Sequence, residues 1–400
     1  MQSGWRVGSL FNIPFFIDRS WFLVVVLIAF VYGSDPAWQE QVGTTAAWGV
    51  GLLFALLLFG SVLLHELGHS LIAQRQGIQV NSITLFLFGG VAAIDKESKT
   101  PGQAFQVAIA GPLVSLFLFL ALTAVSQLPS LPEFGQIVIL NVARTNLVLA
   151  LFNLIPGLPL DGGQVLKSAV WKATGSRSTG IRWAARTGQI LGWTAIGLGV
   201  LAYLSSQRFE LLWIALIGWF AVRNASTYSR VTDLQDAIAS LKAADATVRE
   251  FRVLNADMTL RQFADEQVLQ NPGQAPIYFA ASDGRYRGLV SAEDLRTVER
   301  SEWETRTLHS IAHPLLEIPH VQEDTPLNEV ISQLEESEVS RLTVLTPADA
   351  VAGTVDRGDI VRALAKKMNF RISEAIIQRI KEEGSYPAGL QLAAIAKGAE

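Results

Sequence analysis

Three ionisable residues, His65, Glu66 and His69, lie inside an otherwise apolar stretch, residues 54–73 (FALLLFGSVLLHELGHSLIA), and span only five positions of it. Side chains four residues apart share one face of an α-helix, so the two histidines can bind one metal ion while Glu66 lies beside it as a base. The apolar run 48–73 is long enough to cross a bilayer, where ionisable groups are costly and therefore indicate function. The alternative is two histidines that make ordinary hydrogen bonds at the end of a helix.

Composition predicts that part of the chain lies in lipid. Half of the 400 residues are apolar and 17% are charged, whereas a soluble protein carries about 25% charged residues. The net charge of −4 gives no reason to expect nucleic acid as a partner. The chain has no cysteine, which excludes disulfides and restricts any zinc site to His, Asp and Glu.

About six membrane spans are predicted in residues 1–223, which indicates a polytopic α-helical membrane domain. The predicted spans are 20–33, 48–73, 104–127, 137–158, 187–204 and 209–223. If the N-terminus is cytoplasmic, the basic residues that fall inside are Arg6, Arg19, Arg75, Lys96, Lys99, Lys167, Lys172, Arg177, Arg182 and Arg186. The loops outside hold only Arg208, so both termini are predicted to be cytoplasmic.

This topology places a third potential metal ligand at the depth of the two histidines. The second and fourth spans both run inward, so His65, His69 and Asp161 lie near the cytoplasmic ends of their spans. A catalytic zinc site uses three protein ligands and keeps one position open. Glycines and prolines surround Asp161 and predict broken helix, which at membrane depth lines a cavity or is buried in protein. The alternative is a span that simply ends at these residues.

Residues 50–165 resemble the site-2 protease family of intramembrane zinc metalloproteases, which are peptidase M50-like. The motifs that carry the resemblance, in order, are His65-Glu-x-x-His69, Ala110-Gly111-Pro112 and Asn153-x-x-Pro156-x-x-Pro159-Leu160-Asp161-Gly162. The resemblance implies one Zn²⁺ per chain held by His65, His69 and Asp161. It also implies cleavage of a transmembrane segment of another protein, within or near the membrane. Zinc lowers the pKa of its bound water towards 7, and Glu66 can take that proton as the catalytic residue.

A short β-hairpin at the membrane surface is predicted for residues 81–94, with its turn at Gly89 and Gly90. Our hypothesis is that one strand pairs with an extended substrate segment, with Phe88, Gly89 and Gly90 contacting the substrate. The alternative is a hairpin that only covers the site. Asn153 is a candidate for contacting the substrate backbone or the oxyanion, and a hydrogen bond between helices is the alternative.

The cytoplasmic half, after a linker over 224–245, contains two similar units, 246–300 and 301–366, and a helical tail over 367–400. The units resemble a tandem pair of CBS domains, which implies an α/β fold. The aligned features are Met258-Thr259-Leu260 with Thr325-Pro326-Leu327, and Gly288 to Leu295 with Gly353 to Ile360.

The CBS resemblance implies that an adenine nucleotide such as ATP or AMP binds in the cleft between the units and modulates activity. The implied nucleotide-binding residues are Ser291 and Asp294 in the first unit and Asp359 in the second. Asp356 replaces the usual Ser or Thr of the second unit and would repel phosphate. The alternative is a purely structural pair, or one that makes a homodimer.

The sequence therefore predicts a zinc protease of the lipid bilayer with a cytoplasmic regulatory pair. The family resemblance implies the plasma membrane of a prokaryote or a thylakoid-type membrane. A CBS-regulated ion transporter should have polar groups strung across several spans, whereas here they gather at one depth. A catalytically inactive scaffold is the other alternative, and the intact ligand set argues against it.

Overall fold

The computed structural model describes residues 4–87, 89–95, 97–268, 277–387 and 392–397. The chain divides into two compact units, Met1–Arg230 and Val231–Glu400. The division falls within the predicted linker, inside a single helix. Each unit is described by itself.

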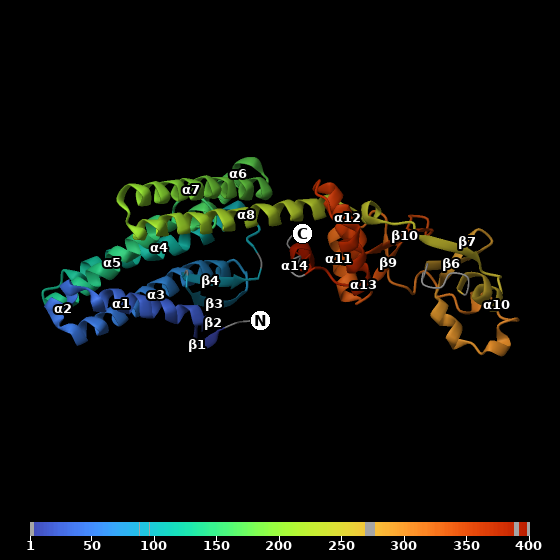
Figure 1. Ribbon diagram of the computed structural model, residues 1–400, viewed down its shortest axis with the longest axis horizontal. Coiled ribbons are helices and arrows are strands. Elements are labelled where there is room, and N and C mark those ends of the chain that lie inside the picture. Colours follow the sequence, from blue (N-terminus) through green and yellow to red (C-terminus); the bar gives the residue numbers. More distant parts are fainter. Residues whose placement is uncertain (1–3, 88, 96, 269–276, 388–391, 398–400) are drawn as a thin grey trace. The chain divides into compact units, whose positions relative to one another are not determined.

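The first unit is a helical bundle with a small sheet at one end (Figure 1). Its helices are α1 (Arg19–Ser34), α2 (Pro36–Val42), α3 (Thr44–Arg75), α4 (Pro101–Ser126), α5 (Glu133–Asn153), α6 (Asp161–Thr174), α7 (Arg177–Ser206) and α8 (Leu212–Ser240), with a 3₁₀ turn at Phe209–Leu211 before α8. Its strands are β1 (Trp5–Leu10), β2 (Ile13–Ile17), β3 (Val80–Phe86) and β4 (Gly89–Ile94).

Several of these helices are apolar and long enough to cross a membrane. In the described residues, four helices qualify by themselves: α3, α4, residues Phe134–Asn153 of α5, and α7. A fifth span results if α1 and α2, which meet at a 70° bend, are counted together. The sixth predicted span, 209–223, forms the 3₁₀ turn and the first part of α8, which does not meet the same criterion. The number six therefore stays a prediction.

The predicted hairpin is half of a four-stranded sheet with the order β1-β2-β3-β4. Strands β3 and β4 pair antiparallel, with Phe86 opposite Gly89. The predicted position of the turn is wrong, because Gly89 and Gly90 are the first two residues of β4. Strands β1 and β2 were not predicted. Both Phe11 and Asn12 between them have positive φ, which is typical of a tight two-residue hairpin turn. Strand β2 then pairs parallel with β3, and the sheet packs on the face of α3 that carries Leu67.

The chain after the fourth predicted span differs from the prediction. Helix α5 ends at Asn153, earlier than the predicted residue 158, and irregular backbone continues to Leu160. The broken segment around Asp161 is thus confirmed, but Asp161 itself begins helix α6. Helix α7 starts at Arg177, ten residues before the predicted span, because its first turns are polar and were not recognised by an apolar pattern.

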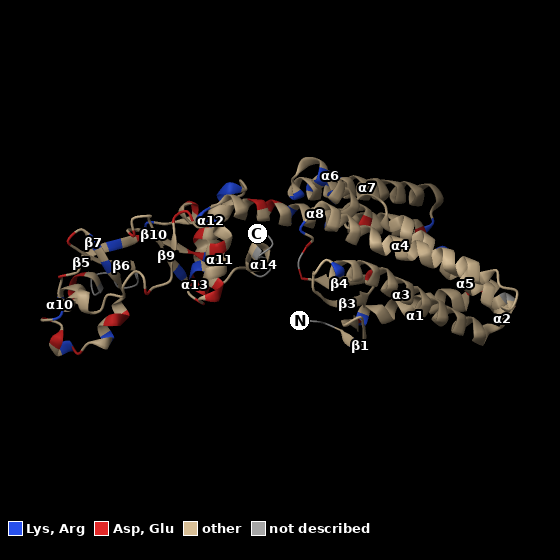
Figure 2. Cartoon of the chain, turned by 180° about the vertical axis from the view of Figure 1, so that it is seen from behind, with Lys and Arg blue, Asp and Glu red and all other residues tan. Residues whose placement is uncertain are grey.

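Charge is distributed unevenly over the first unit. Figure 2 shows that Lys and Arg gather at the end with the strands and α6, while the lengths of the helices are almost free of charge. The exposed side chains along the helices are large and apolar, for example Phe117 on α4 and Leu201 on α7. Apolar side chains along the helices with basic residues gathered at one end are the distribution expected of a membrane protein.

The second unit contains two three-stranded sheets with the same pairing pattern. In the first, β5 (Phe251–Asn255) pairs parallel with β6 (Ile277–Ser282), which pairs antiparallel with β7 (Arg285–Val290). In the second, β8 (His320–Gln322), β9 (Arg341–Leu345) and β10 (Val351–Asp356) repeat this arrangement. The repeated pairing pattern agrees with the predicted internal repeat.

Helices of the two repeats differ in length. The unit's helices are α9 (Ala243–Ala246), α10 (Leu260–Phe263), α11 (Leu327–Glu336), α12 (Arg357–Lys367), α13 (Glu374–Glu383) and α14 (Leu392–Lys397). A π-helical turn, Ala264–Val268, follows α10, and 3₁₀ turns occur at Ala292–Thr297, Arg300–Glu302 and Leu308–Ser310. Buried Phe279 of the first sheet packs with Leu345 and Val351 of the second, so the two repeats share a core.

Candidate metal centre

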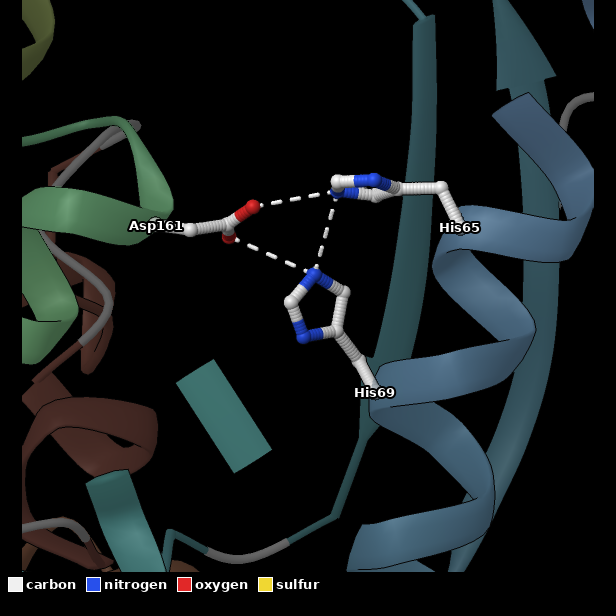
Figure 3. A group of neighbouring side chains, drawn as sticks. All are labelled: His65, His69 and Asp161. Carbon is white, nitrogen blue, oxygen red and sulfur yellow. Dashed lines mark hydrogen bonds and ion pairs between the residues drawn. The ribbon is translucent and has the colours of Figure 1, made fainter. Parts of the chain in front are cut away.

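Two helices bring the three predicted metal ligands together (Figure 3). His65 and His69 project from α3, and Asp161 comes from the start of α6. The Nε2 atom of His65 lies 3.0 Å from Asp161 Oδ2, and the Nε2 atom of His69 lies 3.3 Å from Asp161 Oδ1. The two Nε2 atoms are 3.3 Å apart. Both histidines are buried, and Asp161 is 20% exposed.

These separations fit a metal ion. Four-coordinate zinc with ligand distances of about 2.0–2.2 Å holds neighbouring donor atoms about 3.3 Å apart. The three distances between the His65, His69 and Asp161 donor atoms are 3.0, 3.3 and 3.3 Å. Two imidazoles and one carboxylate are donors that zinc accepts, and three protein ligands leave one position open. The residues present therefore fit the predicted Zn²⁺.

The position of Asp161 depends on close packing of backbone. The Asp161 carboxylate lies in the first turn of α6, where a negative charge is favoured by the helix dipole. A methyl carbon built on Gly163 would collide with the backbone of Gly157, and one built on Gly157 would lie 2.7 Å from Gly188 Cα. Glycine is required at these positions because the irregular segment lies directly between α6 and α7.

Helix α4 supplies two partners that the sequence did not reveal. The Nδ1 atom of His65 lies 2.9 Å from Ser115 Oγ, and the Nδ1 atom of His69 lies 2.6 Å from the carbonyl oxygen of Val107. A carbonyl oxygen can only accept, so His69 donates from Nδ1 and keeps the Nε2 lone pair for a metal. A single serine in an apolar span forms no motif that could be recognised in the sequence, and a backbone carbonyl such as that of Val107 cannot be recognised from residue types.

Glu66 lies on the same helix, half-buried, against strand β4. A methyl carbon built on Gly90 would lie 2.5 Å from Glu66 Cγ and 3.3 Å from its Oε1 atom. The predicted base and the predicted substrate strand are thus in direct contact. Strand β4 is the last strand of its sheet and pairs, among the described residues, only with β3.

The other predicted substrate-binding residues have mixed outcomes. Gly89 opens β4, where its φ of 125° favours glycine. Phe88 lies outside the described residues. Asn153 is the last residue of α5 and is half-buried, and in the described part of the chain its side chain has no hydrogen bond. The structure does not join Asn153 to the cluster of His65, His69 and Asp161.

The predicted nucleotide residues of the first repeat are held by local hydrogen bonds. Ser291 Oγ accepts from the backbone of Glu293, and Asp294 Oδ2 accepts from the backbone N–H of Ser291. The Oδ1 atom of Asp294 lies 3.0 Å from Nε2 of His313, whose side chain is exposed. The backbone contacts form the start of a 3₁₀ turn. His313 is the one exposed partner of Asp294, which a ligand could replace.

Asp359 of the second repeat is instead enclosed by the C-terminal tail. Its Oδ1 atom lies 2.7 Å from Lys381 Nζ and 3.0 Å from a nitrogen of Arg362. Lys381 also contacts Asp356, at 3.1 Å. A methyl carbon built on Gly358 would lie 2.7 Å from Lys381 Cγ, so helix α13 rests directly on the start of α12. Asp359, which was predicted to bind nucleotide, thus already has two basic partners within the second unit.

A known protein family matches each half of the chain. The model of peptidase family M50 matches residues 53–138 and 135–194, which contain His65, His69 and Asp161. The CBS domain model matches residues 311–366, which lie within the second predicted repeat, 301–366.

Two relatives resemble nearly the whole chain. "Putative zinc metalloprotease sll0528" of Synechocystis is 43% identical over 364 residues, covering 91% of this chain and 96% of the relative. "Putative zinc metalloprotease Rip3" of Mycobacterium tuberculosis is 32% identical over 357 residues, covering 88% and 90%. The solved "Site-2 Protease from Methanocaldococcus jannaschii" is 30% identical with a TM-score of 0.41, covering 57% of this chain and 95% of that chain. The chain belongs to peptidase family M50, the site-2 proteases, and carries a CBS domain.

Proposed function

We propose that this chain is an intramembrane zinc metalloendopeptidase that hydrolyses a peptide bond within or near a transmembrane segment of another membrane protein. The observation that carries the proposal is the convergence of His65, His69 and Asp161, with donor atoms 3.0–3.3 Å apart, inside an apolar helical bundle. Glu66 follows His65 on the same helix, which adds a base to the ligand set.

The proposed reaction divides its roles among these residues. His65, His69 and Asp161 would hold the zinc ion, which would supply Lewis-acid chemistry and lower the pKa of a water molecule towards 7. Glu66 accepts a proton as the water oxygen attacks the peptide carbonyl carbon. It then delivers that proton to the amide nitrogen as the C–N bond breaks. The Val107 carbonyl keeps the His69 imidazole oriented by accepting a hydrogen bond from its Nδ1–H.

The substrate is proposed to bind as an extended strand along β4. Proteolysis needs an extended peptide, and β4 has an edge without a strand partner in the described residues, which offers backbone hydrogen-bonding groups to such a peptide. The contact between Gly90 and Glu66 would bring the paired peptide to the catalytic base. Gly89 and Gly90 at the start of the strand expose backbone without side chains that would hinder the peptide.

We propose that the strands and α6 lie at the cytoplasmic face of the membrane. The basic residues near α6 support this placement, because positive charge is enriched on the cytoplasmic side (Figure 2). Both termini would then be cytoplasmic, in the plasma membrane of a prokaryote or a thylakoid-type membrane. Cleavage would take place near this face.

We further propose that the CBS pair modulates cleavage by binding an adenine nucleotide, with the first repeat providing the site. Asp294 has one exposed exchangeable partner, His313, whereas Asp359 is buried under Lys381. Ser291 and Asp294 are therefore better placed than Asp359 to meet a ligand. A nucleotide can regulate the protease only if it binds one arrangement of the protein more tightly than another.

The decisive experiment pairs zinc content with cleavage. The full chain is co-expressed with a set of tagged single-span membrane segments, and fragments are detected by immunoblot. Zinc in the purified protein is measured by mass spectrometry. We expect about one zinc per chain in both the wild type and Glu66→Gln, because this substitution spares the three ligands. We expect cleavage to fall at least 100-fold in Glu66→Gln, since the base is lost.

Glu40→Gln is the matched control, because Glu40 is an exposed glutamate on α2, outside the cluster. It should cleave like the wild type. A wild type without zinc, or Glu66→Gln that cleaves at the control rate, would contradict the proposal. Zinc binding without cleavage of any segment would instead favour a transporter or an inactive scaffold.

A further inference from the structure

Helix α4 presents three positions to the histidines at the same spacing as the histidines themselves. Val107, Gly111 and Ser115 are four residues apart and share one face of α4, which we name the α4 stripe. The Val107 carbonyl contacts His69, and the Ser115 hydroxyl contacts His65. The two helices run antiparallel, so each end of the stripe meets one imidazole at its Nδ1 atom.

Gly111 lies between these two contacts and faces the metal-binding atoms. A methyl carbon built on Gly111 would lie 2.6 Å from His65 Nε2 and would collide with His69 Nε2. Any side chain here would enter the space beside the two metal-binding nitrogens. Gly111 therefore leaves room at the Nε2 side of both rings while its neighbours hold the Nδ1 side.

Small residues on both helices permit this close approach. A methyl carbon built on Gly68 of α3 would lie 2.8 Å from Val114 Cγ2 and 3.0 Å from the carbonyl oxygen of Ala110. Glycine in the interior of a helix costs about 1 kcal/mol relative to alanine. Gly68 and Gly111 bring the α4 backbone within hydrogen-bonding distance of His69, which a pair of bulky helices could not do.

Ser115 differs from an ordinary buried helix serine. Its side chain is fully buried, and its hydroxyl contacts another helix at His65 Nδ1. Ser126, near the end of the same helix, is also buried, but its hydroxyl donates to the Thr123 carbonyl of its own helix. A histidine that binds a metal through Nε2 needs a partner on Nδ1 to fix its tautomer and ring orientation.

We propose that Ser115 is a positioning residue for His65 and that the α4 stripe as a whole orients both zinc-binding imidazoles. The inference rests on the proposed zinc site and extends it to residues that touch neither metal nor substrate. Ser115 Oγ accepts a hydrogen bond from the Nδ1–H of His65, which leaves the Nε2 lone pair directed at the metal. Val107 does the same for His69 through its backbone, which no side-chain substitution can remove.

Zinc affinity tests the role of Ser115 directly. Wild type, Ser115→Ala and the control Ser126→Ala are purified as full chains in detergent, and their zinc dissociation constants are measured by competition with a chromophoric chelator. We expect Ser115→Ala to bind zinc about 10–100-fold more weakly. Ser126→Ala should match the wild type. Cleavage by Ser115→Ala should recover substantially at saturating zinc, since Ser115 acts through the ligand and not on the substrate.

A second pair of variants tests Gly111. Gly111→Ala should lose zinc binding, whereas Gly102→Ala, on the same helix with open space around it, should keep it. Thermal unfolding of the zinc-free proteins checks that both variants fold. Equal zinc affinity in wild type and Ser115→Ala, within twofold, overturns the inference while leaving the protease proposal intact. A wild type that binds no zinc overturns the protease proposal itself.

Discussion

Gly90 of β4 lies against the side chain of Glu66, so close that a methyl carbon on Gly90 would be 2.5 Å from Glu66 Cγ. The contact joins the open edge of a sheet to the residue proposed as the catalytic base. Any side chain at position 90 would therefore have to displace Glu66. Strand β4 and helix α3 are packed directly against each other at this point.

Gly90→Val should therefore reduce cleavage about tenfold or more while zinc content stays at one per chain. The added side chain must displace Glu66, and a misplaced base costs rate at the chemical step. Fragment yield and zinc content are measured on the same preparation. Ala93→Val adds similar bulk at an exposed position of the same strand and should remain active. Loss of zinc in Gly90→Val would show that the contact serves the ligands and not the base.

Prolines at neighbouring positions of β4 can distinguish the hydrogen bonds made at one edge of the strand from those made at the other. Successive residues direct their N–H groups to opposite edges, and proline removes the N–H. Of Val91→Pro and Ala92→Pro, the variant that breaks the bond to β3 should unfold at lower temperature. The other should unfold like the wild type but cleave up to about tenfold more slowly, because a substrate hydrogen bond is lost. If no variant loses cleavage with its stability intact, substrate does not pair with β4.

An ion-pair cluster anchors the segment after β4. Glu97 lies 3.2 Å from the ammonium of the buried Lys167 on α6 and also contacts Arg177 at the start of α7. Burial raises the pKa of the Glu97 carboxyl, but Lys167 and Arg177 outweigh this and hold it below its ordinary value. The stabilisation is thus present above a pH of about 4.5 and is lost as the pH falls through the lowered pKa.

Glu97→Gln should lower the free energy of unfolding by about 1–2 kcal/mol at pH 7, because Lys167 is left buried without its counter-charge while the exposed carboxylate is screened by water. Thermal unfolding at pH 7 and pH 4 provides the measurement. The difference from the wild type should shrink at pH 4, because this pH lies below the ordinary pKa of 4.5 and protonation of Glu97 in the unfolded chain removes part of the stabilisation. A difference that is the same at both pH values, or that matches Glu40→Gln, would count against the cluster.

The two repeats should respond differently when their acidic residues are changed. Binding of AMP to the full chain, followed by calorimetry, should weaken about tenfold in Asp294→Asn, since a hydrogen bond to a charged group is worth about 1.5–3 kcal/mol. Asp359→Asn should bind AMP like the wild type, because Lys381 and Arg362 already occupy that carboxylate. Absence of AMP binding in the wild type would leave the pair with a structural role.

Lys381→Ala should destabilise the second unit by about 2 kcal/mol, because Asp356 and Asp359 would remain close together without the ammonium. Hydrogen exchange of peptides from α12 and α13, followed by mass spectrometry on the full chain, measures the unfolding free energy of this unit. Lys367→Ala removes an exposed lysine from α12 and is the control. A Lys381→Ala protein as stable as this control would mean that α13 is held by its apolar face alone, through Ile377 and Ile380.

Local patterns in the sequence predicted that His65, His69 and Asp161 lie together, and the other contacts of the cluster depend on packing. Helical spacing alone places His65 and His69 on one face, and the inward direction of two spans was enough to select Asp161. Ser115 could not be found this way, because its role depends on the register between α3 and α4. Strands β1 and β2 were missed for a similar reason, since β2 pairs with β3 across three intervening helices. The tail contact of Lys381 is likewise invisible in sequence.

The open edge of β4 has one more consequence. Hydrogen-bonding groups recur along a strand every two residues, so a peptide paired with β4 can shift its register only in steps of two residues, about 7 Å. Glu66 lies against Gly90, so each two-residue shift of the bound peptide would place a different peptide bond at the catalytic base. Alternative cut sites in one substrate would then be separated by even numbers of residues, all with side chains on the same face of the bound strand.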